Sequence, residues 1–224
     1  MAVQSKLGRQ IAEVVAALNG QCVPFALIGG LALASHKVVR ATSDLDLLAP
    51  AAHAGDIDAI AARLGYHCLH RSEDAANYAR GDERLDLLWA IRPLALRLLR
   101  AAAVRATSFG ELPVVSAEGL IGFKLQALAN DPRRTRDLED IRALLQANRG
   151  ALDLAELQEY FRLFDREALL KALLDAAQAS GVRDQAGAYE DPYARLDDLM
   201  LVIEELCPVW PEKPARPAAG QYLL

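Results

Sequence analysis

The sequence predicts an α/β fold in its first half and a helical second half, from three observations. Residues 25–48 read as a strand, a glycine turn, a helix, a basic loop and a second strand. Residues 76–89 carry a β-hairpin pattern. From Ser116 onward, apolar residues recur at helical spacing. We therefore expect an α/β core in residues 1–115, a helical region in 116–207 and a proline-rich tail in 208–224.

Each element of the first half has a local reason. Ile11, Val14 and Leu18 share one face of a predicted helix over 5–19, and Gly20 is a suitable stop. β-rich runs predict strands, and apolar residues at helical spacing predict helices. The further elements expected in this half are strand 23–28, helix 31–38, strand 44–48, helix 54–64, strand 66–70, hairpin strands 76–80 and 85–89, helix 93–104 and a strand pair within 109–115.

The second half is predicted to be helical. Ser116 is a suitable N-cap for its first helix, with an acid in the first turn. The predicted helical segments are 121–129, 138–145, 153–163, 166–179 and 193–206, with a loop over 181–192.

Composition narrows the class of protein. The 224 residues carry a formal net charge of −5, which gives no general attraction to nucleic acid. The three cysteines, Cys22, Cys68 and Cys207, are widely spaced, so we expect reduced, part-buried thiols in a cytoplasmic protein. No apolar run suggests a signal peptide or a membrane span.

Paired aspartates follow a glycine turn. Asp44 and Asp46 are two residues apart on a predicted strand, so their side chains point to one face. Neighbouring carboxylates repel unless a cation lies between them, and Mg²⁺ commonly takes one or two carboxylates plus phosphate oxygens. Gly29 and Gly30 lie where a strand gives way to a helix, where a backbone without Cβ atoms can approach a phosphate. The pattern indicates phosphoryl or nucleotidyl transfer.

A third acid has two open interpretations. Asp86 lies in an otherwise apolar predicted strand, where a carboxylate is costly unless something pairs with it. A neighbouring strand could bring it to Asp44 and Asp46 as a third carboxylate. Alternatively it faces solvent or Arg84 at a strand edge.

Charged residues of the helical half are the last candidates. Lys124 is the single cation in two apolar helical turns, and it either reaches solvent along its stem or faces a phosphate. Arginines 133, 134 and 136 crowd before a helix whose first turn holds Asp137. Cations at the positive end of a helix are unfavourable unless an acid or anion lies near.

The four histidines show no metal-ligand spacing. We expect His67 and His70 at the surface, and Tyr78 and Trp89 in the core rather than as base-stacking platforms. His36 lies in the predicted loop before Arg40, where it could face a substrate.

These residues together resemble the nucleotidyltransferase superfamily, and most closely its AbiEii-like toxin branch. The resemblance rests on Gly29-Gly30, then Arg40-Ala-Thr-Ser-Asp-Leu-Asp46, then Lys124 followed by Arg136-Asp137-Leu-Glu-Asp140. It covers about residues 25–145. It implies a mixed sheet flanked by helices, with the acids on adjacent strands and the helical region completing the active site.

The resemblance also implies a role for each residue. Asp44, Asp46 and Asp86 would bind Mg²⁺ or Mn²⁺, with Asp86 alternatively acting as the base. Lys124 would bind phosphate, Asp137 would orient Lys124 or the nucleotide, and Arg136 would support it. The nucleotide-binding residues would be Gly29, Gly30, Arg40, Thr42, Ser43, Lys124 and Arg136.

The leading hypothesis is transfer of a nucleoside monophosphate from an NTP to a hydroxyl of tRNA, a protein or a small molecule, as in toxin–antitoxin or abortive-infection systems with a possible cognate antitoxin. One alternative is adenylylation of an aminoglycoside, for which acids at 73–74, 82–83 and in the tail could form an acidic pocket. Another is a degenerate nucleotide-binding or antitoxin-binding module.

Overall fold

The computed structural model describes residues 5–183 of the chain, with side chains described as far as residue 177. These residues divide into two compact units between Phe123 and Lys124. The predicted helix 193–206, Cys207, the tail 208–224 and most of the loop 181–192 lie outside the described residues. Within them, every helix is too short or too polar to cross a membrane.

The first unit is built on one mixed sheet, which confirms the predicted α/β class. Its strands are β1 (Ala26–Leu27), β2 (Asp44–Pro50), β3 (His67–Arg71), β4 (Ala75–Arg80), β5 (Glu83–Ala90), β6 (Ala103–Thr107) and β7 (Gly110–Val114). They lie in the order β3-β4-β5-β2-β1-β7-β6. The pairs β2·β5 and β1·β7 are parallel, and the other four pairs are antiparallel.

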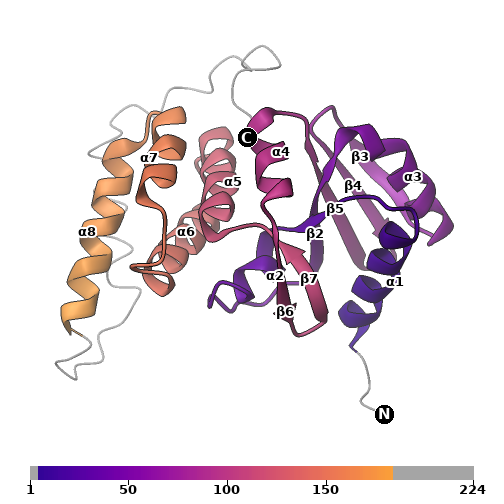
Figure 1. Cartoon of the computed structure of the whole chain (residues 1–224), viewed down its shortest axis with the longest axis horizontal. Helices are drawn as coiled ribbons and strands as arrows, with labels where there is room; N and C mark the ends of the chain where they lie inside the picture. The colour runs from indigo at the N-terminus through magenta and orange to yellow at the C-terminus, as the bar shows by residue number, and fades with distance from the viewer. Residues whose placement is uncertain (1–4, 184–224) are drawn as a thin grey trace. The chain divides into compact units, whose positions relative to one another are not determined.

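Helices cover this sheet. They are α1 (Lys6–Gly20), α2 (Gly29–Ala34), the short 3₁₀ turn η1 (Ala51–His53), α3 (Ala54–Arg63), α4 (Pro93–Arg100) and the start of α5 (Ala117–Asn130). In Figure 1, α1 and α3 lie on one side of strands β3 to β5, and α4 lies on the other. The α1 helix buries Ile11, Val14 and Leu18, while Ser5 accepts a hydrogen bond from Gly8 N at 3.0 Å. The apolar stripe and the cap together explain why this segment is helical.

The second unit is helical, as predicted. It contains the rest of α5, then α6 (Thr135–Ala147), α7 (Leu154–Leu163) and α8 (Glu167–Arg183). The α8 helix packs against α6 and α7. Its core is made of aliphatic and aromatic side chains, among them Ile141, Leu144, Leu157, Tyr160, Phe161 and Leu173. The Asp153 carboxylate caps α7 by accepting from the backbone N–H groups of Ala155 and Glu156.

Several sequence-based boundaries are wrong. The helix expected over 93–104 ends at Arg100, and 103–107 is strand β6, which pairs with β7 around a turn at Ser108-Phe109. Ladder hydrogen bonds to β7 outweigh the helical pattern there. The strand expected over 23–28 shortens to β1, and the helix expected over 31–38 is α2, which starts at Gly29 and ends at Ala34. The α8 helix continues through 181–183, where a loop was expected.

Cysteine exposure also differs from the expectation. Cys22 and Cys68 are free thiols, as predicted, but both are exposed rather than part-buried. Cys22 follows the end of α1 with φ of 54°, and Cys68 lies in β3, whose residues are all exposed. Strand β3 lies at the border of the sheet, and its side chains, including Cys68, remain exposed there.

Candidate active site

The first unit brings the three predicted acids to adjoining positions of one sheet. Strands β2 and β5 are parallel, and their register sets Asp46 directly beside Asp86. Asp44 lies two residues before Asp46, so all three side chains leave the same face of the sheet. Leu45 and Leu47 alternate with these acids and are fully buried on the other face. The apolar residues thereby fix the direction in which the acids point.

Gly29 lies against the Asp46 carboxylate. Its φ is +63°, and a Cβ atom built there would lie 2.1 Å from Asp46 Oδ2. The backbone N–H of Ile28 donates to Asp46 O at 3.0 Å, which ties the glycine turn to β2. Only glycine suits this position, because it needs both a left-handed backbone and the space of a missing side chain.

Gly30 is covered by the loop that leads into β2. A Cβ atom at Gly30 would meet Thr42 Oγ1 at 2.8 Å and an Arg40 guanidinium nitrogen at 3.2 Å. Ser43 Oγ donates to Asp44 Oδ1 at 3.0 Å. The structure therefore gathers the glycine pair, Arg40, Thr42, Ser43 and the acids in one place.

The surroundings of Asp86 change the pKa of its carboxyl group. Burial, above all, raises its pKa, and repulsion from the Asp44 carboxylate adds to that effect. The Asn77 side-chain amide donates to Asp86 Oδ1 at 2.8 Å and opposes the rise. Asn77 was not foreseen as a site residue. The signal was present, because the hairpin register of β4 and β5 sets residue 77 opposite residue 86.

Asp44 and Asp46 could supply some, but not all, of the ligands of a metal ion. Within residues 5–183, no group of three His, Cys, Asp or Glu side chains is arranged to hold a metal ion. Mg²⁺, however, usually keeps several waters and binds through one or two carboxylates plus substrate phosphates. Asp44 and Asp46, on one face of β2, offer carboxylate oxygens of that kind, and the Asp46 carboxylate lies directly against Gly29.

The second unit holds the other predicted residues in a buried charge cluster. Lys124 Nζ donates to Asp137 Oδ1 at 3.1 Å and to Asp140 Oδ2 at 2.5 Å. Arg134 Nε donates to the second oxygen of Asp137 at 2.5 Å. Lys124, Asp137 and Asp140 are each more than nine-tenths buried. The arginine found beside Asp137 is therefore Arg134, whereas Arg136 is exposed.

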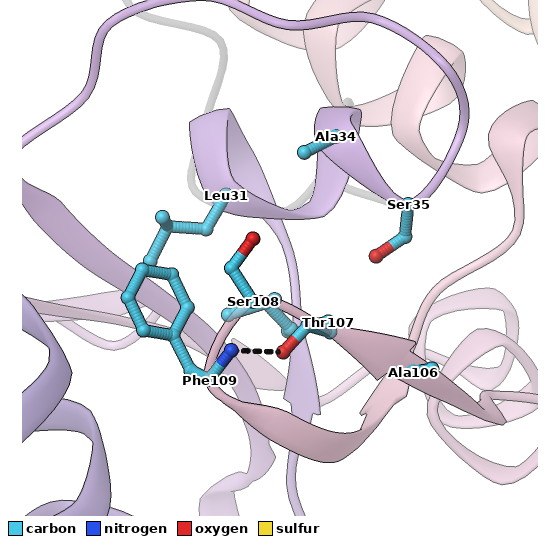
Figure 2. A pocket seen from close by; sticks show the side chains of 8 residues that line it. Leu31, Ala34, Ser35, Ala106, Thr107, Ser108 and Phe109 are labelled. Carbon is cyan, nitrogen blue, oxygen red and sulfur yellow. Dashed lines mark hydrogen bonds between the residues drawn. The ribbon is translucent and has the colours of Figure 1, made fainter. Parts of the chain in front are cut away.

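A small pocket opens beside α2 in the first unit (Figure 2). Its volume is about 150 Å³. One wall comes from α2 and Ser35, and the other from the turn between β6 and β7, where Phe109 N donates to Thr107 Oγ1 at 3.0 Å. The lining is mostly apolar with a few hydroxyls, and it holds no charged residue: Leu27, Leu31, Ala34, Ser35, Ala106, Thr107, Ser108 and Phe109.

The histidines divide between core and surface. His67 and His70 are exposed on β3, as expected. His36 is only 4% exposed, and its Nε2 donates to the Val115 carbonyl at 2.7 Å, so it ties the end of α2 to the segment after β7. Burial, above all, lowers its pKa, and Arg105 lowers it further. Tyr78 and Trp89 are buried, as predicted for core residues.

Solved structures of other proteins share the overall fold. The solution structure of the antibiotic-resistance factor ANT(2'')-Ia matches with a TM-score of 0.57 at 18% identity, over 81% of this chain and 100% of that one. The crystal structure of ANT(2")-Ia in complex with adenylyl-2"-tobramycin matches with a TM-score of 0.54 at 20% identity, over 72% of this chain and 98% of that one. At identities this low, the likeness shows that the fold is shared.

The sequence itself gives the family. Residues 3–180 match a family model described as an uncharacterised nucleotidyltransferase. That range is well over half of the chain, so the protein belongs to this family and is a nucleotidyltransferase. A search of curated proteins found no match.

Proposed function

We propose that the protein transfers a nucleoside monophosphate from an NTP to a hydroxyl group, with Mg²⁺ or Mn²⁺ bound at Asp44 and Asp46. The observation that carries this proposal is the joint position of Asp46, Asp86 and Gly29. Asp46 and Asp86 are register neighbours, and Gly29, at a position that only glycine suits, lies against Asp46. Such a site suits a cation and a polyphosphate together.

Each residue then has a chemical role. A divalent cation at Asp44 and Asp46 would offset the phosphate charge and polarise the α-phosphorus. Arg40, Thr42 and Ser43 lie beside the glycine pair and the acids, and would be polar partners of the phosphates. Asp86, steadied by Asn77, would either help to hold a cation or accept the proton of the attacking hydroxyl. Lys124 would contact phosphate as a point charge, oriented by Asp137, with Arg136 in support.

The class of acceptor is inferred from the resemblance, the net charge and the exposed arginines. The resemblance to AbiEii-like toxins rests on Lys124 and on the Arg136-Asp137 pair, and it supports an RNA or protein acceptor and a cognate antitoxin. The net charge of −5 argues against a broad nucleic-acid groove, so an RNA acceptor would need a local basic surface. The arginines at 133, 134 and 136 are exposed and are the described residues best suited to one.

A small-molecule acceptor is the second candidate. It is favoured by the fold shared with ANT(2")-Ia, whose crystal structure contains adenylyl-2"-tobramycin. A polycationic drug would require free acids around the site. Of the acids considered for such a pocket, Asp82 pairs with Lys6 and Glu83 pairs with Arg80, which leaves fewer carboxylates for a cation. A neutral acceptor with hydroxyl groups is therefore a better match than an aminoglycoside.

A labelling experiment tests the proposal. The purified chain would be incubated with Mg²⁺, each of the four α-labelled NTPs in turn, and total RNA, cell lysate or a panel of hydroxylated small molecules. We expect label on one acceptor class, none after chelation, and none with Asp46→Asn. Equal labelling by the wild type and by Asp46→Asn would refute the proposal. NTP binding by the wild type without transfer or metal dependence would favour the degenerate binding module.

A further inference from the structure

A row of polar side chains crosses three strands of the first unit, and its member on β4 is Asn77. The β4·β5 register sets Asn77 opposite Asp86, and the β2·β5 register sets Asp86 beside Asp46. Residues directly opposite each other on neighbouring strands point to the same face of a sheet. Asn77, Asp86 and Asp46 therefore form one line across the face that carries the acids.

This face of the sheet borders solvent along the row. Each of the three side chains belongs to a half-buried residue. The residues that follow them in their strands point to the other face and are buried: Tyr78, Leu87 and Leu47. The opposite face is therefore core, while water and ions can approach the row.

The Asn77 amide fixes one oxygen of the Asp86 carboxylate. Asn77 Nδ2 donates to Asp86 Oδ1 at 2.8 Å, which is the one side-chain hydrogen bond to that carboxylate found among residues 5–183. A carboxylate only accepts hydrogen bonds, so the amide nitrogen rather than the amide oxygen has to face it. Because the two oxygens of a carboxylate diverge from one carbon, the bond to Oδ1 on the β4 side turns Oδ2 away from Asn77.

On its other side, Asp86 has acids for neighbours. Asp46 is its register neighbour on β2, and Asp44 lies two residues before Asp46 on the same face. Neighbouring carboxylates repel unless a cation lies between them. Mg²⁺ commonly takes one or two carboxylates and completes its shell with water and phosphate oxygens. The oxygen of Asp86 that Asn77 does not hold is thus the one suited to a cation shared with Asp46.

An arginine on the same face has other partners. Arg84 is the register neighbour of Asp44. Its Nη1 donates to the carbonyl oxygens of Gly81 at 2.9 Å and of Glu83 at 3.0 Å. These bonds direct this end of the guanidinium to the turn between β4 and β5, so Arg84 serves that turn.

We propose that Asn77 is a positioning residue, which holds Oδ1 of Asp86 so that Oδ2 is presented to a divalent cation shared with Asp46. This inference rests on the proposed function, and of the two roles given there to Asp86 it requires that of a cation ligand. Asn77 touches neither the cation nor the nucleotide and acts through Asp86. Groups that hydrogen-bond a ligating carboxylate orient it in this way, and their loss generally weakens metal binding.

The first arm of the test needs neither metal nor nucleotide. Asn77→Ala removes the amide with little risk to the fold, because β4 already has alanine on the same face at positions 75 and 79. Metal-free crystal structures should show the Asp86 carboxylate against Asn77 in the wild type, and rotated or disordered in the variant. Asn77→Ser, whose hydroxyl falls one bond short of the amide nitrogen, is the second variant should Asn77→Ala not fold. An unchanged Asp86 orientation in the folded variant would overturn the inference.

The second arm measures metal binding by titrating Mn²⁺ and following the free ion by electron paramagnetic resonance. We expect Asn77→Ala to raise the Kd for Mn²⁺ about tenfold to a hundredfold. Asn19→Ala is the matched control, because it truncates an exposed amide in the same unit, and it should leave the Kd unchanged. In an Asp86→Asn background, Asn77→Ala should have no further effect, because Asn77 acts through Asp86.

The outcomes separate this inference from the function on which it rests. Mn²⁺ binding by the wild type with an unchanged Kd for Asn77→Ala would overturn the inference alone. A loss of the same size in the Asp86→Asn background would do the same, because Asn77 would then act independently of Asp86. No Mn²⁺ binding by the wild type, either alone or with a non-hydrolysable NTP, would overturn the metal-dependent proposed function and this inference with it.

Discussion

Asp46 and Asp86 are register neighbours on two parallel strands, so their carboxylates emerge side by side from one face of the sheet. Strands β2 and β5 are far apart in the chain, and only their pairing brings these acids together. Adjacent carboxylates without a cation repel each other, and this repulsion has consequences that can be measured.

Asparagine at either acid of β2 should remove catalysis while keeping the fold. We expect Asp44→Asn and Asp46→Asn to lower nucleotidyl transfer by about 10²-fold or more, because both would lose a charge that a cation needs. The metal-free Tm should stay level or rise, since a like-charge repulsion is relieved. Labelled-NTP assays measure the loss of transfer, and thermal melts measure the Tm. Unfolding of both variants would show that the acids are structural.

Alanine at Gly29 should harm both stability and activity. The residue would have to keep φ near +63°, and its Cβ atom would collide with the Asp46 carboxylate. The left-handed backbone alone costs about 1–2 kcal/mol for a residue with a side chain. Gly55→Ala is the matched control, because nothing lies within 4 Å of a Cβ atom there, and it should leave activity unchanged. Equal behaviour of the two variants in denaturant melts and assays would contradict the site geometry.

Removing the Lys124 ammonium should weaken binding of the NTP phosphates and slow the reaction. We expect Lys124→Ala to raise the KM for NTP and to lower kcat by about 10²–10³-fold, as other losses of electrostatic stabilisation do. The variant should also lose stability, because Asp137 and Asp140 would remain buried without the ammonium that they share. Steady-state kinetics on the folded fraction, measured beside circular dichroism, separate the two effects. Wild-type kinetics in Lys124→Ala would exclude a role in phosphate binding.

His36 should make the protein sensitive to mild acid. Burial lowers its pKa below the ordinary value of 6.5, so the folded state favours the neutral ring. Its contribution is therefore present above pH 6.5 and is lost as the pH falls through the lowered folded-state pKa, because the unfolded chain takes up the proton first. His36→Gln should flatten the fall in Tm between neutral and mildly acidic pH. An unchanged slope would assign the acid sensitivity to other groups.

Local patterns were enough to predict the candidate acids but not all of their partners. The alternation of Leu45, Asp46 and Leu47 predicts which face the acids take, since a strand has a period of two. The pairing of β2 with β5 depends on packing across a long chain separation, so the position of Asp86 stayed open until the register was known. Asn77 was missed for another reason, because the register of the predicted hairpin, which sets residue 77 opposite residue 86, was not worked out.

The helical half shows a different limit. Lys124 is buried and contacts Asp137 and Asp140, whereas the sequence left it either reaching solvent along its stem or facing a phosphate. Which arginine reaches Asp137 depends on where α6 begins: Arg134 is its N-cap, and Arg136 lies within the first turn and is exposed. A boundary uncertain by two residues therefore changes the assignment. Strand β6 was missed because its pairing with β7, rather than its own composition, decides its conformation.

The two outermost strands of the sheet, β3 and β6, leave one row of backbone hydrogen-bonding groups each without a neighbouring strand in the described residues. Such borders are templates for uncontrolled self-assembly, and Leu69 and Val104 add exposed apolar side chains there, at 61% and 68% exposure. The chain counters this hazard with a bulge between Cys68 and His70 and with the cations Arg71 and Arg105 on the same strands. Variants that remove the bulge or the cations from these two border strands should make the protein prone to aggregation without changing its candidate active site.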